Sequence, residues 1–176
     1  ADCLGSELFG ARVAIIGLGR VGKLLHSYCT TFGAELTWYD VDEGINTRVF
    51  NGRKFDIDEL LRNCELCFLT CSYHEEIGCV IDAQKLKLLH GKYFVNTARG
   101  ELVDYDSLYE MVEGGKFKGV ALDVFPDEQV TQFNFKRFKD LARLRSDIIV
   151  TAHAAGATIN SMHKTECFIV EKLFET

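Results

Sequence analysis

The chain has 176 residues, of which 20 are Lys or Arg and 26 are Asp or Glu, so its formal net charge is −6. This length predicts one domain of ordinary size, and the acidic balance argues against a general polyanion binder, which needs a basic face. Apolar residues make up 47% and charged residues 26%, values that are typical of a soluble globular protein rather than a disordered one. No apolar run approaches the roughly 20 residues that a membrane helix requires.

The seven cysteines are an odd number without framework spacing, and several lie inside apolar runs. We interpret the cysteines in the apolar runs as small hydrophobes, and the whole set as that of a reduced, cytoplasmic protein. Cys64-x-x-Cys67 with Cys71 could indicate a metal site, but no second spaced pair accompanies it. We therefore expect core packing for these residues and no bound metal.

Short apolar runs alternate with amphipathic stretches along the chain, a pattern typical of an α/β protein. Strands are predicted at 13–17, 35–40, 66–71, 93–96, 119–124 and 148–151, and helices at about 21–32, 56–63, 82–89, 104–113, 133–144 and from 157 onward. The first strand, Val13-Ala-Ile-Ile-Gly17, is continuously apolar, which predicts burial on both faces. The expected fold class is therefore α/β, a doubly wound parallel sheet (Rossmann fold) with helices on both faces.

A glycine-rich loop, Gly17-Leu-Gly19-Arg-Val-Gly22, follows the first strand and opens the first helix. In this context Gly17 allows the tight turn, Gly19 lets the backbone approach a pyrophosphate, and Gly22 lets helix and strand pack closely. The pyrophosphate then lies at the helix N-terminus, where free N–H groups favour negative charge. The alternative is a glycine turn that binds nothing.

Asp40 ends the second predicted strand, 18 residues past Gly22, where a carboxylate can accept hydrogen bonds from the adenosine ribose hydroxyls. A 2′-phosphate at this place would face a like charge, and the nearest following basic residue is Arg48. The sequence therefore predicts NAD rather than NADP as the cofactor.

Three later segments lie near the ends of predicted strands: Asn96–Glu101, Ala121–Glu128 and Thr151–Thr158. In a doubly wound sheet these carboxyl ends line one crevice, where ligands bind. A crevice with Arg, Glu and His beside a nicotinamide suits carbonyl reduction, because His can transfer a proton and Arg can hold a carboxylate. Taken singly, an Arg, Glu or His side chain in a loop is more often structural than catalytic.

Together the glycine loop, Asn96-Thr-Ala-Arg-Gly-Glu101, Leu122-Asp-Val-Phe125 and the His153 loop resemble the nucleotide-binding domain of the D-2-hydroxyacid dehydrogenase family. The resemblance covers nearly all 176 residues. It implies that Arg99 binds the substrate, Glu128 supports the histidine, and His153 is the general acid/base. It also implies a set of cofactor contacts: Gly17, Gly19, Arg20, Val21, Gly22, Asp40, Thr97, Ala98, Arg99, Asp123 and His153.

The activity implied is an NAD-dependent oxidoreductase that interconverts a D-2-hydroxy acid and a 2-oxo acid. Residues 1–176 would form the dinucleotide-binding domain, with the substrate domain in other sequence. We therefore expect this chain alone to bind NAD with little turnover, and the full-length protein to be a homodimer that binds neither nucleic acid nor membrane. Two alternatives remain: an NAD-sensing module of the C-terminal binding protein corepressor type, and a degenerate domain that serves only assembly.

Overall fold

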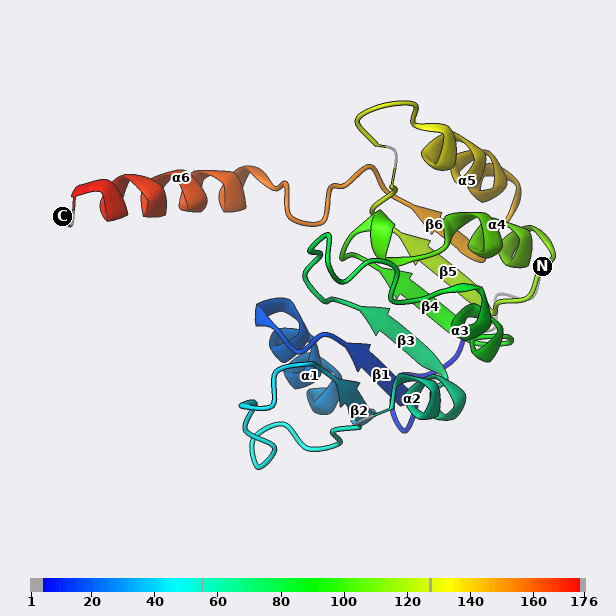
Figure 1. Cartoon of the computed structure of the whole chain (residues 1–176), viewed down its shortest axis with the longest axis horizontal. Helices are drawn as coiled ribbons and strands as arrows, with labels where there is room; N and C mark the ends of the chain where they lie inside the picture. Colours follow the sequence, from blue (N-terminus) through cyan, green and yellow to red (C-terminus); the bar gives the residue numbers. More distant parts are fainter. Residues whose placement is uncertain (1–4, 55, 127, 175–176) are drawn as a thin grey trace.

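The computed structural model describes residues 5–54, 56–126 and 128–174 (Figure 1). Six strands form one sheet, all parallel, in the order β2-β1-β3-β4-β5-β6. They are β1 (Arg12–Ile16), β2 (Glu35–Tyr39), β3 (Leu66–Leu69), β4 (Tyr93–Asn96), β5 (Gly119–Leu122) and β6 (Ile148–Val150). The predicted fold class, a doubly wound parallel sheet, is confirmed.

The helices alternate with the strands along the chain. They are α1 (Arg20–Thr31), α2 (Ile57–Asn63), α3 (Ala83–Leu88), α4 (Tyr105–Glu113), α5 (Phe133–Leu144) and α6 (Ile159–Phe174), with a short 3₁₀ turn, η1, at Gly100–Leu102. Asp56, Asp82 and Asp104 each accept a hydrogen bond from a backbone N–H of the first turn of α2, α3 and α4. These side-chain caps explain why the three helices begin where they do.

The sheet is buried on both faces, as the apolar runs predict. Val13 and Ile15 of β1 join a cluster on the α1 side of the sheet, whereas Ala14 and Ile16 face the opposite cluster. Successive side chains of a strand point to opposite faces, so one apolar strand contributes to two cores. One core therefore lies under α1 and the other under α2, α3, α4 and α5.

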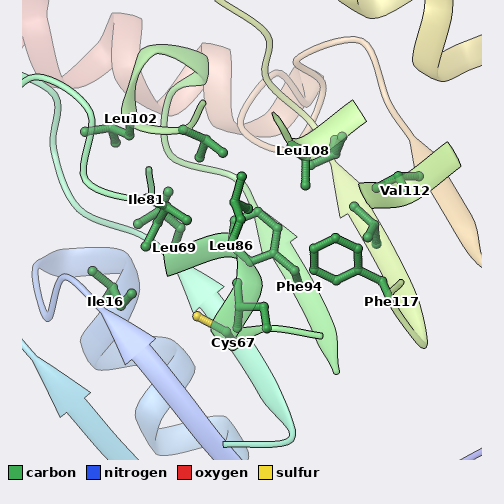
Figure 2. Packing of buried hydrophobic residues seen from close by; sticks show 14 of the residues in the cluster. Ile16, Cys67, Leu69, Ile81, Leu86, Phe94, Leu102, Leu108, Val112 and Phe117 are labelled. Carbon is green, nitrogen blue, oxygen red and sulfur yellow. The ribbon is translucent and has the colours of Figure 1, made fainter. Parts of the chain in front are cut away.

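The larger core lies between strands β3 to β5 and the helices on that side (Figure 2). Cys67 and Phe94 are fully buried and contribute to it from β3 and β4, and Leu86 and Leu108 contribute from α3 and α4. Cys64 is also buried, at 2% exposed, in the same cluster. The expectation that Cys64 and Cys67 pack in the core is confirmed.

The order of strands reverses between β1 and β3. The chain passes from β1 outward to β2 and then returns to β3 on the other side of β1. Beyond β2, Arg53 forms an isolated parallel bridge with Trp38. In an open α/β sheet, ligands bind outside the carboxyl ends of the strands at such a reversal. The fold therefore places the crevice beside the Gly17 loop.

Five strand predictions extend too far at their carboxyl ends. The residues beyond the observed strand ends include Gly17, Asp40, Cys71, Val124 and Thr151. Val124 shows the reason, because it is 1% exposed although it follows the last paired residue of β5. An apolar run reports burial, and burial continues into the loops at this edge after strand pairing stops.

The last two helices differ in how they contact the rest of the molecule. Phe138 of α5 is fully buried, and Phe135 and Leu141 pack beside it against the larger core. Helix α6 extends away from the sheet and contains no buried residue (Figure 1). None of the described helices is long and apolar enough to cross a membrane.

Candidate active site

The glycine loop connects β1 to α1 through two close backbone contacts. Gly17 has φ 94°, and a β carbon there would lie 2.4 Å from the backbone of Cys71. A β carbon at Gly22 would lie 2.1 Å from the carbonyl oxygen of Gly17. Both positions therefore require glycine, Gly17 for conformation and space and Gly22 for helix packing.

Gly19 differs, since nothing lies within 4 Å of a β carbon built on it. It is the N-cap of α1, and within the described chain no side chain caps this helix and no acidic residue lies in its first turn. Arg20 and Val21 are exposed in that first turn. The N-terminus of α1 therefore has no side-chain cap, and Gly19 borders open space, as a pyrophosphate site requires.

Thr70 and Cys71, directly after β3, hold this loop in place. The Thr70 hydroxyl donates a 2.6 Å hydrogen bond to the Gly17 carbonyl oxygen. Burial raises the pKa of the Cys71 thiol to about 11, so the thiol is neutral beside the loop at physiological pH. Neither residue was singled out from the sequence for this role, because only the folded sheet brings β3 next to β1.

Asp40 directly follows β2 and turns back toward the glycine loop. One carboxylate oxygen accepts from the Leu18 backbone N–H at 2.5 Å and the other from the Asp42 N–H at 2.8 Å. A carboxylate has about four acceptor positions, so each oxygen can still accept a ribose hydroxyl. The geometry fits the adenosine half of NAD. The diphosphate would lie at the glycine loop after β1, and the adenosine ribose would lie at Asp40 after the adjacent strand β2.

Glu128 and His153 contact each other through their side chains. His153 Nδ1 lies 2.7 Å from Glu128 Oε2, and Glu128 Oε1 accepts from the Phe125 backbone N–H at 2.5 Å. His153 has φ 52°, the left-handed region that is uncommon for residues other than glycine. A cavity of about 280 Å³ adjoins the pair, with Phe125 and Phe135 in its lining.

Asp123 holds the loop that carries His153. It is 5% exposed, and its carboxylate accepts from the Thr151 hydroxyl at 2.5 Å and the backbone N–H groups of Ala154 and Ala155 at 2.8 and 3.1 Å. The His153 N–H donates to the Asp123 carbonyl oxygen at 2.8 Å. These bonds explain how the loop maintains the unusual φ of His153. The cofactor contact expected of Asp123 stays a prediction.

Arg99 lies on the turn that follows β4. Thr97 and Arg99 are exposed, and Ala98 between them is 7% exposed. The Arg99 guanidinium donates to the Ala98 carbonyl oxygen at 2.7 Å, so most of its N–H groups remain available for a ligand. Asn96, whose side chain was not singled out from the sequence, accepts from the Ala98 N–H and donates to the Arg99 carbonyl oxygen.

All the predicted site residues follow the carboxyl ends of strands in one sheet. Arg99 follows β4, Asp123 and Glu128 follow β5, and His153 follows β6, and these three strands are neighbours in parallel register. The Gly17 loop and Asp40 follow β1 and β2 at the same edge, with β3 between the two groups. A dinucleotide bound along this edge would extend from Asp40 toward His153.

Comparison with known proteins agrees with this arrangement. Residues 1–155 match the family described as D-isomer specific 2-hydroxyacid dehydrogenase, NAD binding domain. The chain belongs to this family. The match is to the family's NAD-binding domain, and NAD is therefore the cofactor of this chain.

Two curated members of the family are each 27% identical to this chain. They are a glyoxylate reductase from Thermofilum pendens, for which the alignment covers 91% of this chain and 46% of that protein, and a hydroxypyruvate reductase from Thermotoga maritima, with 97% and 54%. A solved D-lactate dehydrogenase from Aquifex aeolicus, complexed with NAD and lactic acid, superposes with TM-score 0.85 and 31% identity over 99% of this chain and 56% of that one. The chain thus spans about half the length of these relatives.

Proposed function

We propose that the full-length protein is an NAD-dependent dehydrogenase that interconverts a D-2-hydroxy acid and a 2-oxo acid. The observation that carries this proposal is the 2.7 Å Glu128–His153 contact at the same sheet edge as the cofactor loop. We also propose that residues 1–176 are its dinucleotide-binding domain, and that a substrate domain lies in sequence outside this range. The relatives described above support this, since each is about twice as long.

Bound NAD would supply the hydride acceptor or donor, held by Gly17, Gly19 and Gly22 with Arg20, Val21 and Asp40, and at its other end by Thr97, Ala98 and Asp123. Glu128 orients His153, because a carboxylate at Nδ1 keeps that nitrogen protonated and leaves Nε2 to exchange a proton. In the reducing direction His153 protonates the carbonyl oxygen, and in the oxidising direction it removes the hydroxyl proton. Arg99 binds the substrate carboxylate and polarises the carbonyl.

A steady-state assay of the full-length protein with NADH and a panel of 2-oxo acids tests this proposal. We expect NADH oxidation with at least one short-chain acid such as pyruvate, glyoxylate or hydroxypyruvate, and stereospecific formation of the D-hydroxy product. NADH binding without turnover on any acid would contradict the enzyme hypothesis and favour the corepressor-type alternative. The two curated relatives are named as reductases, which supports the hypothesis that the full-length protein is an enzyme.

The preference for NAD over NADP is a separate prediction. Both Asp40 oxygens lie where they accept backbone N–H groups beside the ribose position, so a 2′-phosphate would meet a fixed negative charge. We expect the isolated chain to bind NADH at least about tenfold more tightly than NADPH, a difference of roughly 1.4 kcal/mol. Fluorescence titration of the two cofactors measures it. Asp40→Asn should reduce the difference, and tighter binding of NADPH by the unaltered chain would refute the role of Asp40.

We further propose that the full-length protein is a cytoplasmic homodimer that associates through this domain. Helix α6 exposes Ile159, Met162, Phe168, Ile169 and Leu173, each at least half accessible, and exposed apolar patches of this kind are typical of interfaces. Sedimentation equilibrium of the full-length protein should give twice the monomer mass. Replacing Ile169 and Leu173 by Ser should lower that mass, whereas Lys164→Ser on the same helix should not; a monomer before substitution would contradict the proposal.

A further inference from the structure

Tyr105, the first residue of α4, lies between the segment that carries Arg99 and the segment that carries Glu128. It is 4% exposed, its hydroxyl donates a hydrogen bond to the Val124 carbonyl oxygen, and the same hydroxyl accepts from Asn96 Nδ2 at 3.4 Å. Its ring packs edge-on against Phe125 with centroids 5.5 Å apart. One buried side chain thus contacts both segments.

On one side, Asn96 extends the contact to the Arg99 turn. The Asn96 side chain is fully buried, and Nδ2 donates to the Arg99 carbonyl oxygen at 3.1 Å while Oδ1 accepts from the Ala98 N–H at 3.0 Å. These two bonds fix the backbone on both sides of the Ala98–Arg99 peptide. The position of the Arg99 side chain therefore depends on where Asn96 is held.

On the other side, Val124 is followed by the residue that binds Glu128. The Phe125 N–H donates to Glu128 Oε1 at 2.5 Å, and Glu128 Oε2 contacts His153 Nδ1 at 2.7 Å. The two segments also touch directly, because a β carbon on Gly100 would lie 2.2 Å from the Phe125 carbonyl carbon. A shift of Val124 would therefore displace the carboxylate that orients His153.

We propose that Tyr105 is a positioning residue whose hydroxyl joins the Arg99 turn to the Glu128–His153 pair, so that the two move as one unit. This inference rests on the proposed function, because the coupling has meaning for a reaction in which Arg99 and His153 act on one substrate. Burial raises the pKa of Tyr105 far above its usual range. The hydroxyl consequently stays protonated and remains a donor throughout the physiological pH range.

Tyr109 provides a matched control on the same helix. Its hydroxyl donates to Glu113 at 3.1 Å, and its ring packs edge-on against Phe138 at 5.4 Å, as the Tyr105 ring does at 5.7 Å. Tyr105→Phe and Tyr109→Phe each remove one hydroxyl and keep the ring. They differ in that the Tyr105 hydroxyl alone contacts Asn96 and Val124.

The test is ¹⁵N NMR of the isolated chain in both variants. In Tyr105→Phe we expect the amide signals of Ala98, Arg99, Phe125 and Glu128 to shift together, and the His153 Nδ1–H resonance to broaden or be lost. In Tyr109→Phe these signals should keep their original positions. Unchanged Phe125 and His153 signals in a folded Tyr105→Phe chain, or equal shifts in Tyr109→Phe, would overturn the proposal.

Hydrogen exchange of the unaltered chain gives a second test that does not depend on the variant folding. If one hydroxyl joins the two segments, the Ala98 and Phe125 amides should open in one step, with protection factors that agree within about threefold. Protection that differs by more than about tenfold would show independent segments and contradict the proposal. Both measurements report on geometry and need no turnover. They would therefore still test the role of Tyr105 if the full-length protein had no dehydrogenase activity.

Discussion

His153→Ala in the full-length protein is expected to lower turnover of the 2-oxo acid by roughly 10²–10⁴-fold, the usual contribution of a positioned general acid or base. The reason is that His153, oriented by Glu128 at 2.7 Å, is the residue proposed to exchange the substrate proton. Stopped-flow measurement of NADH oxidation at saturating substrate determines the loss. The affinity of the isolated chain for NADH, measured by fluorescence, should change little, because the glycine loop and Asp40 are untouched.

His90→Ala is the matched control for this prediction. His90 is exposed in the turn between α3 and β4, at the amino end of the sheet and away from the crevice. Its removal should leave both turnover and NADH affinity at their original values. A His153→Ala enzyme with near-normal turnover would show that another group transfers the proton, and equal losses in both variants would indicate a general effect on folding.

Alanine at the three loop glycines should separate stability from cofactor binding. Gly17→Ala meets both a φ of 94° and a backbone contact at 2.4 Å, and Gly22→Ala meets a carbonyl oxygen at 2.1 Å. At Gly17, strain and overpacking together cost about 2–6 kcal/mol, whereas Gly22 has only the steric contact. For a chain of this size each kcal/mol lowers Tm by roughly 2–4 °C. The Tm of the Gly17→Ala variant should therefore fall by roughly 5–20 °C.

Gly19→Ala should behave in the opposite way. No atom lies within 4 Å of its β carbon, so the Tm should change little, while NADH affinity should fall by at least about tenfold because the methyl group stands where the pyrophosphate approaches. Gly78→Ala is the control for the Gly17 variant, because Gly78 has φ 61° with open space around it. Its loss of stability measures backbone strain without the steric contact. Unaltered NADH binding by Gly19→Ala would contradict the cofactor position, and an unaltered Tm of Gly17→Ala would contradict the tight turn.

The elements of this fold could be predicted because their residues report local physics. The apolar periodicity of the helices and strands and the Asp caps of α2, α3 and α4 each act within a few residues. The glycine loop was likewise predictable, since its conformation depends on the strand before it and the helix after it. The carboxyl ends of the strands were less predictable, because buried loop residues such as Val124 continue the apolar pattern after pairing has ended.

The composition, periodicity and glycine motif of this chain were by themselves enough to predict an α/β fold and a dinucleotide loop, and the family resemblance added Arg99, Glu128 and His153 as candidate site residues. Only the tertiary structure decided how these residues are held: Asp123 through the Thr151 hydroxyl and the Ala154 and Ala155 N–H groups, and Tyr105 between Asn96 and Val124. The physical reason is the separation along the chain of the residues that interact. Side-chain spacing along a chain encodes strand and helix periods, whereas hydrogen bonds between separate strand ends exist only once parallel pairing has brought those ends to one edge of the sheet.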